Sequence, residues 1–242
     1  MEPSPAPALR LAVMQPYLFP YLGYFQLMAA SDRFVAYDDV SYIRQGWVNR
    51  NRILVQGQPY LFTLPVRSAS SFIPIDQVEL HPAQYRAWRE RFLRTLAQAY
   101  ARAPHAGTVI PWLRELLDEP HERLVDLLTA TLRSTMDRLG LRTAFVPSSR
   151  PYANQHLHGQ DRILDICRLE GASGYINAIG GMALYDRAVF ASRGIELSFL
   201  RSRLPAYPQG RHPFVPGLSI LDALMHVDVE GLQGMLREYD LE

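Results

Sequence analysis

Two adjacent carboxylates, Asp38 and Asp39, directly follow a short run, Arg33 to Tyr37, that is typical of a β-strand. Aromatic, amide and guanidinium side chains then follow closely. This stretch has too little apolar periodicity to be core and too many donors and acceptors to be a plain loop. Polar groups at the end of a strand are typical of a site that recognises a small polar molecule. The sequence therefore predicts that Asp38 and Asp39 are catalytic residues. It predicts that the substrate is bound by Tyr42, Asn49, Arg50 and Asn51.

The two carboxylates have three interpretations. They could supply a general base that deprotonates an attacking ammonium, form a pair of magnesium ligands, or simply end a strand with polar groups. Neighbouring residues of a strand point to opposite faces, so both would reach one ion only if the strand has ended. We favour one functional and one structural aspartate.

Residues 49–52, Asn-Arg-Asn-Arg, offer amide and guanidinium donors in sequence. They could bind a phosphate, a carboxylate or sugar hydroxyls, and Arg50 suits bidentate contacts. Alternatively, Asn49 and Asn51 could bond their own backbone in a turn. Trp47 could stack on a sugar ring, although a half-buried ring that anchors the loop is the interpretation we favour.

A second polar loop is predicted to meet the first. Residues 9–14 read as a buried strand, and 22–30 as a short helix that leads into the strand at 33–37. Such a βαβ unit brings the carboxyl ends of both strands to one rim, so the intervening loop and residues 37–52 should form one pocket. The substrate-binding residues predicted on this loop are Gln15, Tyr17 and Tyr21. Asn177, which ends a later strand before Gly180-Gly181, is a further one, with a plain tight turn as the alternative.

The remaining elements alternate between strand and helix. We expect a hairpin within 52–66, three helices between 82 and 140, and a helix at 160–170. Strands are expected at 143–146, 174–177 and 195–200, with a helix near 182–192. Ser219 and Asp222 have the spacing of a capping pair before a last helical region. This alternation predicts one α/β domain over 9–242 with a helical insertion at 82–140, after a flexible N-terminus at 1–8.

Composition excludes several classes of function. Hydrophobic residues make up 48% and charged residues 20% of the 242, which is typical of a globular protein, and the net charge of +1 argues against binding nucleic acid through bulk charge. No apolar run approaches the ~20 residues that span a bilayer, and no signal peptide is recognisable. The single Cys167 excludes an internal disulfide and fits a reducing compartment. We therefore expect a soluble cytoplasmic protein without a membrane span.

All 25 basic residues are Arg, because the chain contains no Lys. A P-loop lysine, a pyridoxal Schiff base and a lysine nucleophile are thereby excluded. His156 and His158 are the only close histidine pair, and no cluster supplies the further ligands that zinc needs, so no metal site is predicted. Cys167 shares a helix face with Ile163 and Leu164, which favours a packed thiol over a nucleophile. The cofactor stays undetermined.

Several blocks resemble the WbqC-like protein family of small bacterial proteins associated with polysaccharide (O-antigen) biosynthesis. The matching blocks are Met14-Gln15-Pro16-Tyr17-Leu18-Phe19-Pro20-Tyr21-Leu22-Gly23-Tyr24-Phe25-Gln26, residues 37–52, 171–177 with Gly180-Gly181 and Tyr185-Asp186, and Tyr207-Pro208-Gln209 with 218–222. The resemblance implies attachment of an amino acid or another acyl group to the amine of an amino sugar.

A weaker resemblance concerns the fold. The first strand, Tyr21-Leu22-Gly23-Tyr24 and the next strand resemble the nucleotidyltransferase type of Rossmann-like fold, whose His-x-Gly-His histidines are replaced here by Tyr21 and Tyr24. We therefore expect a Rossmann-like, mostly parallel sheet with a helical insertion, but without adenylate transfer, because tyrosine carries no positive charge near pH 7.

These features together predict a transferase that forms a carbon–nitrogen bond. It would move an aminoacyl or acyl group from an activated donor, such as a carrier-protein thioester, to an amino sugar or a similar amine. Asp38 or Asp39 would act as base, and the protein would otherwise act by positioning. One alternative is a non-catalytic partner protein that binds a sugar or a nucleotide-sugar. Another is a ligase or transferase that uses a nucleotide.

Overall fold

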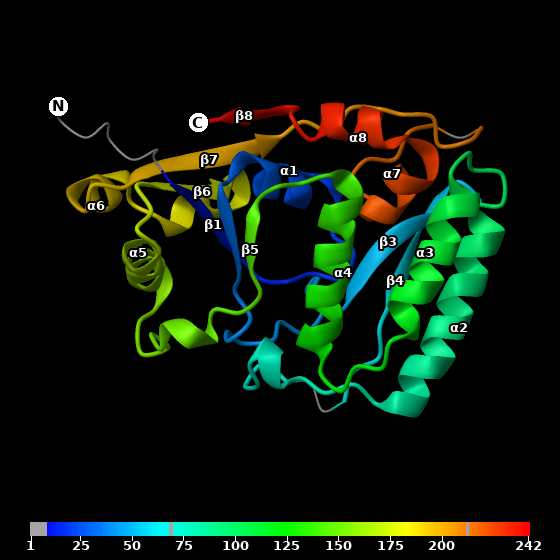
Figure 1. The fold of residues 1–242 in the computed structure, drawn as a ribbon, viewed down its shortest axis with the longest axis horizontal. Coiled ribbons are helices and arrows are strands. Elements are labelled where there is room, and N and C mark those ends of the chain that lie inside the picture. The colour runs from blue at the N-terminus through cyan, green and yellow to red at the C-terminus, as the bar shows by residue number, and fades with distance from the viewer. Residues whose placement is uncertain (1–8, 68–69, 212) are drawn as a thin grey trace.

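A computed structural model describes residues 9–67, 70–211 and 213–242, so the N-terminus predicted to be flexible lies outside the described residues. The strands form a six-stranded sheet and a separate hairpin (Figure 1). The sheet contains β1 (Arg10–Met14), β2 (Arg33–Ala36), β5 (Ala144–Val146), β6 (Gly174–Ala178), β7 (Glu196–Ser202) and β8 (Tyr239–Leu241), and the hairpin contains β3 (Arg50–Val55) and β4 (Gln58–Thr63).

The helices vary widely in length. The α-helices are α1 (Leu22–Ala30), α2 (Pro82–Ala99), α3 (Ala106–Asp118), α4 (Leu124–Leu139), α5 (Gly159–Glu170), α6 (Arg187–Ser192), α7 (Ile220–His226) and α8 (Val229–Met235). Three short 3-10 helices are η1 (Ile75–Gln77), η2 (Arg150–Tyr152) and η3 (Ile179–Leu184).

The sheet is doubly wound. Its strand order is β5-β2-β1-β6-β7-β8, in which the first five run parallel and only β8 is antiparallel. Numbered along the chain, the parallel strands follow the order 3-2-1-4-5 of a Rossmann-like half, which confirms the predicted fold class. The closer likeness to nucleotidyltransferases stays a prediction. The order reverses between β1 and β6, which pair only through residues 10–11 and 174–175, well before either strand ends.

Helices cover both faces of this sheet, because successive strand residues point to opposite sides. Leu11 and Val13 of β1 pack with Ile163 and Cys167 of α5, whereas Ala12 belongs to the core beneath α1 and α4. Figure 1 shows α5 on one side of the sheet and α1 and α4 on the other. The predicted packed thiol at Cys167 is confirmed, since it is fully buried.

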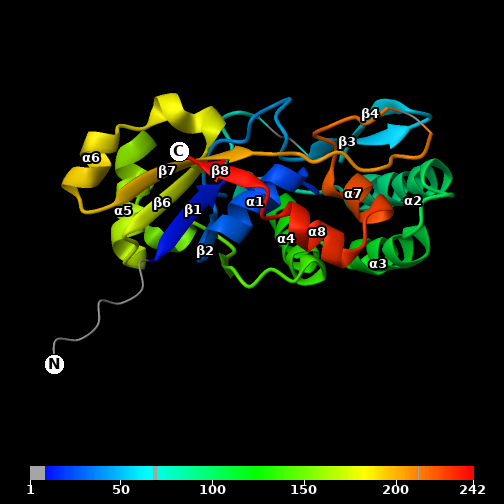
Figure 2. The ribbon, with the colours of Figure 1, turned by 90° about the horizontal axis from the view of Figure 1, so that it is seen from above.

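Beside the sheet stands a helical layer made of α2, α3 and α4, in which α4 lies nearest the sheet and the β3–β4 hairpin lies alongside the helices (Figures 1 and 2). Helix α2 begins at Pro82, whose fixed backbone suits a first turn, and buries a row of stacked rings that includes Trp88 and Phe92. Helix α4 ends at Gly140, which adopts the left-handed conformation that stops a helix. This layer is formed by the residues predicted to be a helical insertion.

The structure corrects four details of the predicted elements. The Gly180-Gly181 segment belongs to η3 and is not a simple turn, and the helix expected from residue 182 begins only at Arg187. Strand β8 was not predicted. Ser219 caps α7 as expected by accepting a hydrogen bond from the Leu221 amide, but Asp222 is not its capping partner. The Asp222 carboxylate binds tyrosine and glutamine side chains from other segments instead.

Candidate functional site

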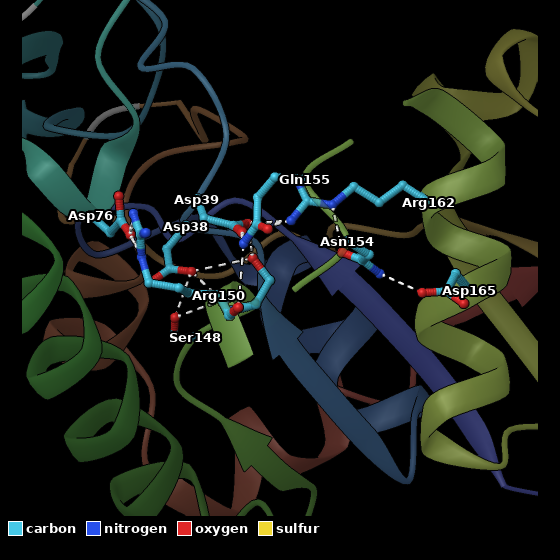
Figure 3. A network of polar contacts seen from close by, with 10 residues as sticks. Asp38, Asp39, Asp76, Ser148, Arg150, Asn154, Gln155, Arg162 and Asp165 are labelled. Carbon is cyan, nitrogen blue, oxygen red and sulfur yellow. Dashed lines mark hydrogen bonds and ion pairs between the residues drawn. The ribbon is translucent and has the colours of Figure 1, made fainter. Parts of the chain in front are cut away.

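Asp38 and Asp39 lie at the carboxyl end of β2, where the chain leaves the sheet (Figure 3). Both are buried, and both bind the segment 148–155 that follows β5. Since β2 and β5 are parallel neighbours, their carboxyl ends meet at one rim, which brings this distant segment to the two aspartates. The two carboxylates nevertheless have different surroundings.

Asp39 is held in a complete network of donors. One guanidinium nitrogen of Arg162 bridges both carboxylate oxygens at 2.7 and 2.6 Å, the Gln155 amide donates at 2.7 Å, and the Ser149 hydroxyl donates as well. Burial works to raise the pKa of Asp39, but these hydrogen bonds and the charge of Arg162 outweigh it and lower the pKa. Asp39 is therefore an ionised carboxylate whose bonding capacity is used within the protein.

Arg162 reaches Asp39 from the first turn of α5 and is itself buried. Its Nε donates to the Asn154 side chain at 2.9 Å, and its guanidinium lies 4.8 Å from the centroid of the Tyr37 ring. Asn154 in turn donates to Asp165 of α5 at 2.9 Å. The ion pair thus fixes α5 and the 149–155 loop to the end of β2.

Asp38 has fewer partners. All of its side-chain hydrogen bonds come from Ser148 and Ser149 and end on one oxygen, Oδ1, at 2.9 to 3.2 Å. Burial raises its pKa, the two serines counteract this in part, and the nearby charge of Asp76 adds to the increase. A carboxylate with a raised pKa is a better base than an ordinary one.

A cavity of about 570 Å³ opens beside Asp38, within the usual size range of small-molecule sites. It lies between the rim of the sheet and the beginning of α4. Charged groups of both signs line it. The ionisable lining residues are Asp38, Asp76, His121, Arg123, Asp126, Arg133 and Arg150. This lining suits a ligand that carries both an amine and an anionic group.

Two buried polar atoms in the cavity lining have no hydrogen-bond partner among the described residues, namely Oδ1 of Asp76 and Nε2 of His121. The other Asp76 oxygen is paired with Arg150. Burial lowers the pKa of His121, only partly opposed by Asp126 and Glu119, which keeps its imidazole neutral at pH 7. Buried polar groups are nearly always satisfied in native proteins, so these two atoms indicate where a bound molecule would be contacted.

Three predicted substrate-binding residues are buried and bonded within the fold. The Tyr42 hydroxyl donates to Asn49 at 2.7 Å, and the Asn49 amide donates to the Leu64 carbonyl at 2.7 Å. The Asn51 amide donates to the Phe19 carbonyl at 2.7 Å, while its oxygen accepts from the backbone of Arg52. These contacts join the 41–51 segment to β4 and to the loop after β1.

The other predicted residues are distributed along the rim. Arg50 donates to the Gly46 carbonyl at 2.8 Å and lies 6.0 Å from the ring centroid of Trp47, which is 43% exposed and so less buried than expected. Tyr17 and Tyr21 pack against the core beneath α1. Gln15 directly follows β1, and Asn177 lies near the end of β6. The strand order reverses between these two strands. None of these residues lines the cavity beside Asp38.

The cavity also contains residues that sequence reasoning missed. Asp76, His121 and Arg133 come from η1, from the loop before α4 and from α4 itself, and no motif marks them. Ser148 and Ser149 had a detectable signal, because they directly follow a predicted strand at 143–146. Among the described residues, no group of three or more His, Cys, Asp or Glu side chains is arranged to hold a metal ion.

The fold and this rim define the class, a doubly wound α/β protein with an ionisable pocket at the carboxyl edge of its sheet. The chain belongs to the WbqC-like protein family, whose pattern it matches over residues 15–233. It is also similar to an uncharacterized protein of Mycobacterium tuberculosis, Rv1507c, with 28% identity over 224 residues that cover 91% of this chain and 95% of the relative. No solved structure matches the chain.

Every helix in the described part of the chain is too short or too polar to cross a lipid bilayer.

Proposed function

We propose that the protein is a transferase that forms an amide on an amine substrate, with Asp38 as the general base. The observation that carries this proposal is the position of Asp38, a buried carboxylate at the end of β2 that lines a cavity shared with Arg123 and Arg133. Asp39 is the structural member of the pair, since Arg162, Gln155 and Ser149 occupy it. An amino sugar of polysaccharide or O-antigen biosynthesis, as the family resemblance implies, is the acceptor we favour. We also propose a cytoplasmic location, in keeping with the single Cys167.

The chemistry requires a neutral amine. An incoming ammonium would lie between Asp38 and Asp76 and lose one proton to Asp38. The free nitrogen then attacks the carbonyl carbon of an acyl or aminoacyl thioester, such as one on a carrier protein. As the carbon–nitrogen bond forms, the carbon–sulfur bond breaks, and the departing sulfur takes up the proton that Asp38 holds. The regenerated Asp38 carboxylate then accepts the second proton from the nitrogen, which leaves the amide, and releases that proton to water.

Two arginines that line the same cavity would bind the anionic part of the acceptor or donor. Arg123 is the N-cap residue of α4 and Arg133 lies within the helix, so one helix positions both arginines. Guanidinium groups bind carboxylates and phosphates in a planar, bidentate manner. Holding the amine at Asp38 and the anion at α4 would align the nitrogen for attack, which is the main source of rate in a protein without its own nucleophile.

Mass spectrometry tests this function. The purified protein is incubated with glycyl and acetyl thioesters of coenzyme A as donors and with glucosamine and UDP-glucosamine as acceptors. An amide product that requires the protein and is lost in Asp38→Asn supports the proposal. Saturable acceptor binding without any product would contradict it and identify the protein as a sugar-binding partner of another enzyme.

A second candidate function rests on the point where the strand order reverses. The carboxyl ends of β1 and β6 separate there, next to Gln15 and Asn177, and doubly wound sheets bind nucleotides at this position. A ligase or transferase that uses a nucleotide would place it at this crevice. Thermal stabilisation by ATP that depends on magnesium, and that is abolished by Asn177→Ala, would favour this function over the thioester-dependent one.

A further inference from the structure

A second cavity, of about 780 Å³, lies at the other end of the helical layer. Its walls are the turn between β3 and β4, the end of α2 with the loop that follows it, the 208–211 loop, and His226 at the end of α7. In Figure 1, α4 begins at the lower end of the layer and α2 finishes at the upper end, near α7. The two cavities share no lining residue.

The charge of this second cavity differs from that of the first. Its ionisable lining residues, within the described parts of the chain, are Arg102, Arg211, Tyr100 and His226, and no carboxylate lines it. Two glutamines, Gln56 and Gln98, add neutral amide donors. The cavity beside Asp38, in contrast, has three aspartates in its lining. A wall of donors and guanidinium groups without acidic side chains favours an anionic ligand.

His226 is oriented to offer a hydrogen-bond acceptor to a bound molecule. Its Nδ1 lies 2.9 Å from the backbone carbonyl of Asp222, which can only accept, so Nδ1 carries a proton. Its Nε2 makes no hydrogen bond to any described residue and is left for a bound molecule. The imidazole is held edge-on against the Tyr100 ring, with centroids 5.6 Å apart.

A buried network fixes the wall behind His226. Asp222 is fully buried and accepts hydrogen bonds from Tyr100 and Tyr207, both at 2.8 Å, and from Gln209 at 2.7 Å. The Gln209 oxygen accepts in turn from the Val215 amide at 2.7 Å. Because every member of the network is bonded, the cavity wall is preorganised, which reduces the entropy lost on binding.

We propose that this second cavity binds a small organic phosphate. Arg102 and Arg211 would contact the phosphate oxygens, and Nε2 of His226 would accept a hydrogen bond from a hydroxyl of the organic part. Leu54, Pro104 and Pro208 offer apolar surface to the organic part, and the volume is far larger than a bare phosphate needs. This site goes beyond the proposed transferase reaction, because none of its residues takes part in the chemistry at Asp38.

Calorimetry with ribose 5-phosphate and with ribose as the uncharged comparison tests the site. We expect saturable binding of ribose 5-phosphate, no binding of ribose, and at least a tenfold loss of affinity in the double variant Arg102→Gln/Arg211→Gln. The matched control Arg86→Gln removes an exposed arginine from α2 outside this cavity and should bind as the native protein does. Circular dichroism would verify that each variant is folded.

Three results would overturn this proposal. The first is no saturable binding of ribose 5-phosphate to the native protein, and the second is an unchanged affinity in the folded double variant. The third is a tenfold loss in Arg133→Gln instead, which would place the phosphate in the cavity beside Asp38. Amide formation is measured in a separate experiment. A failure of the phosphate-site proposal can therefore be told apart from a failure of the proposed transferase function.

Discussion

Asp38 and Asp39 are neighbours in sequence whose charges have opposite consequences for stability. The ionised form of Asp39 is stabilised by Arg162, and its pKa is lowered in the fold. Its contribution to the free energy of unfolding is therefore present above the ordinary carboxyl pKa of about 4 and is lost as the pH falls through the lowered value. Asp38, whose pKa is raised by burial, costs stability when ionised, and this cost disappears as the pH falls.

The opposite pKa shifts of Asp38 and Asp39 predict different stabilities for their two isosteric variants. At pH 7, Asp39→Asn should lower the free energy of unfolding by about 3–5 kcal/mol, because it leaves the buried guanidinium of Arg162 without its counter-charge. Asp38→Asn should be neutral or slightly stabilising. Urea unfolding between pH 7 and pH 3 measures the free energy of unfolding of both variants. The loss of stability at acid pH that we assign to Asp39 should be absent in Asp39→Asn. Equal destabilisation by the two variants would refute this division of roles.

At the scale of single residues, the sequence predicted the local part of the site and missed the distant part. Asp38 and Asp39 are recognisable because they directly follow a strand. Asp76, His121 and Arg133 reach the same cavity from segments whose place is set only by how the chain folds. The amides of Asn49 and Asn51 were recognisable as unusual, but burial decides what they bond, and burial there depends on packing against Phe19 and Leu64.

At the scale of secondary-structure elements, helix α1 packs very closely against the sheet at its N-terminal end. Gly23 lies where a Cβ atom would come within 2.4 Å of both the Ser202 hydroxyl on β7 and the ring of Tyr21. Only glycine permits this approach. The same residue holds the beginning of α1, and with it the loop after β1, against the sheet.

Gly23→Ala should therefore destabilise the protein by about 1–3 kcal/mol, the usual cost of overpacking a core. Gly107→Ala in α3 is the matched control, since a Cβ there meets no atom within 4 Å, and alanine should be neutral or stabilise by up to about 1 kcal/mol. Thermal unfolding of both variants measures the difference. A Gly23→Ala protein as stable as Gly107→Ala would show that α1 can move away without cost.

Element prediction succeeded where local signals and tertiary packing agree. Pro82 and Gly140 delimit the helical layer, and the apolar periodicity between them matches the buried faces of α2 and α4. It failed where a long-range partner intervenes. Asp222 has the spacing of a capping residue, yet Tyr100, Tyr207 and Gln209 compete for its carboxylate more effectively than the helix end does.

In the whole molecule, one continuous core links the sheet to the helical layer. Buried residues of α1, of the β3–β4 hairpin and of α2 to α4 belong to a single hydrophobic cluster, including Phe25, Ile53, Phe92 and Leu128. The cavity beside Asp38 lies where this layer meets the rim of the sheet. The single domain, with the helical layer as an insertion, stays a prediction that unfolding experiments can test.

We accordingly predict one cooperative unfolding transition. Trp88 and Trp112 are carried by α2 and α3, so tryptophan fluorescence reports mainly on the helical layer, whereas hydrogen exchange of β6 and β7 reports on the sheet. Both probes should give the same midpoint in urea. Separate midpoints would mean that the layer folds as its own domain, and that ligand binding could move it relative to the sheet.

The central claim, that Asp38 is the base for amide formation, is tested most directly by the kcat of Asp38→Asn with the thioester donor and amine acceptor found by mass spectrometry. We predict a decrease in kcat of roughly 10²- to 10⁴-fold, the usual contribution of a general base, in a protein as stable as the native one. Asp161→Asn, at an exposed position of α5, should retain native activity. A native kcat in Asp38→Asn would show that Asp38 is not the base.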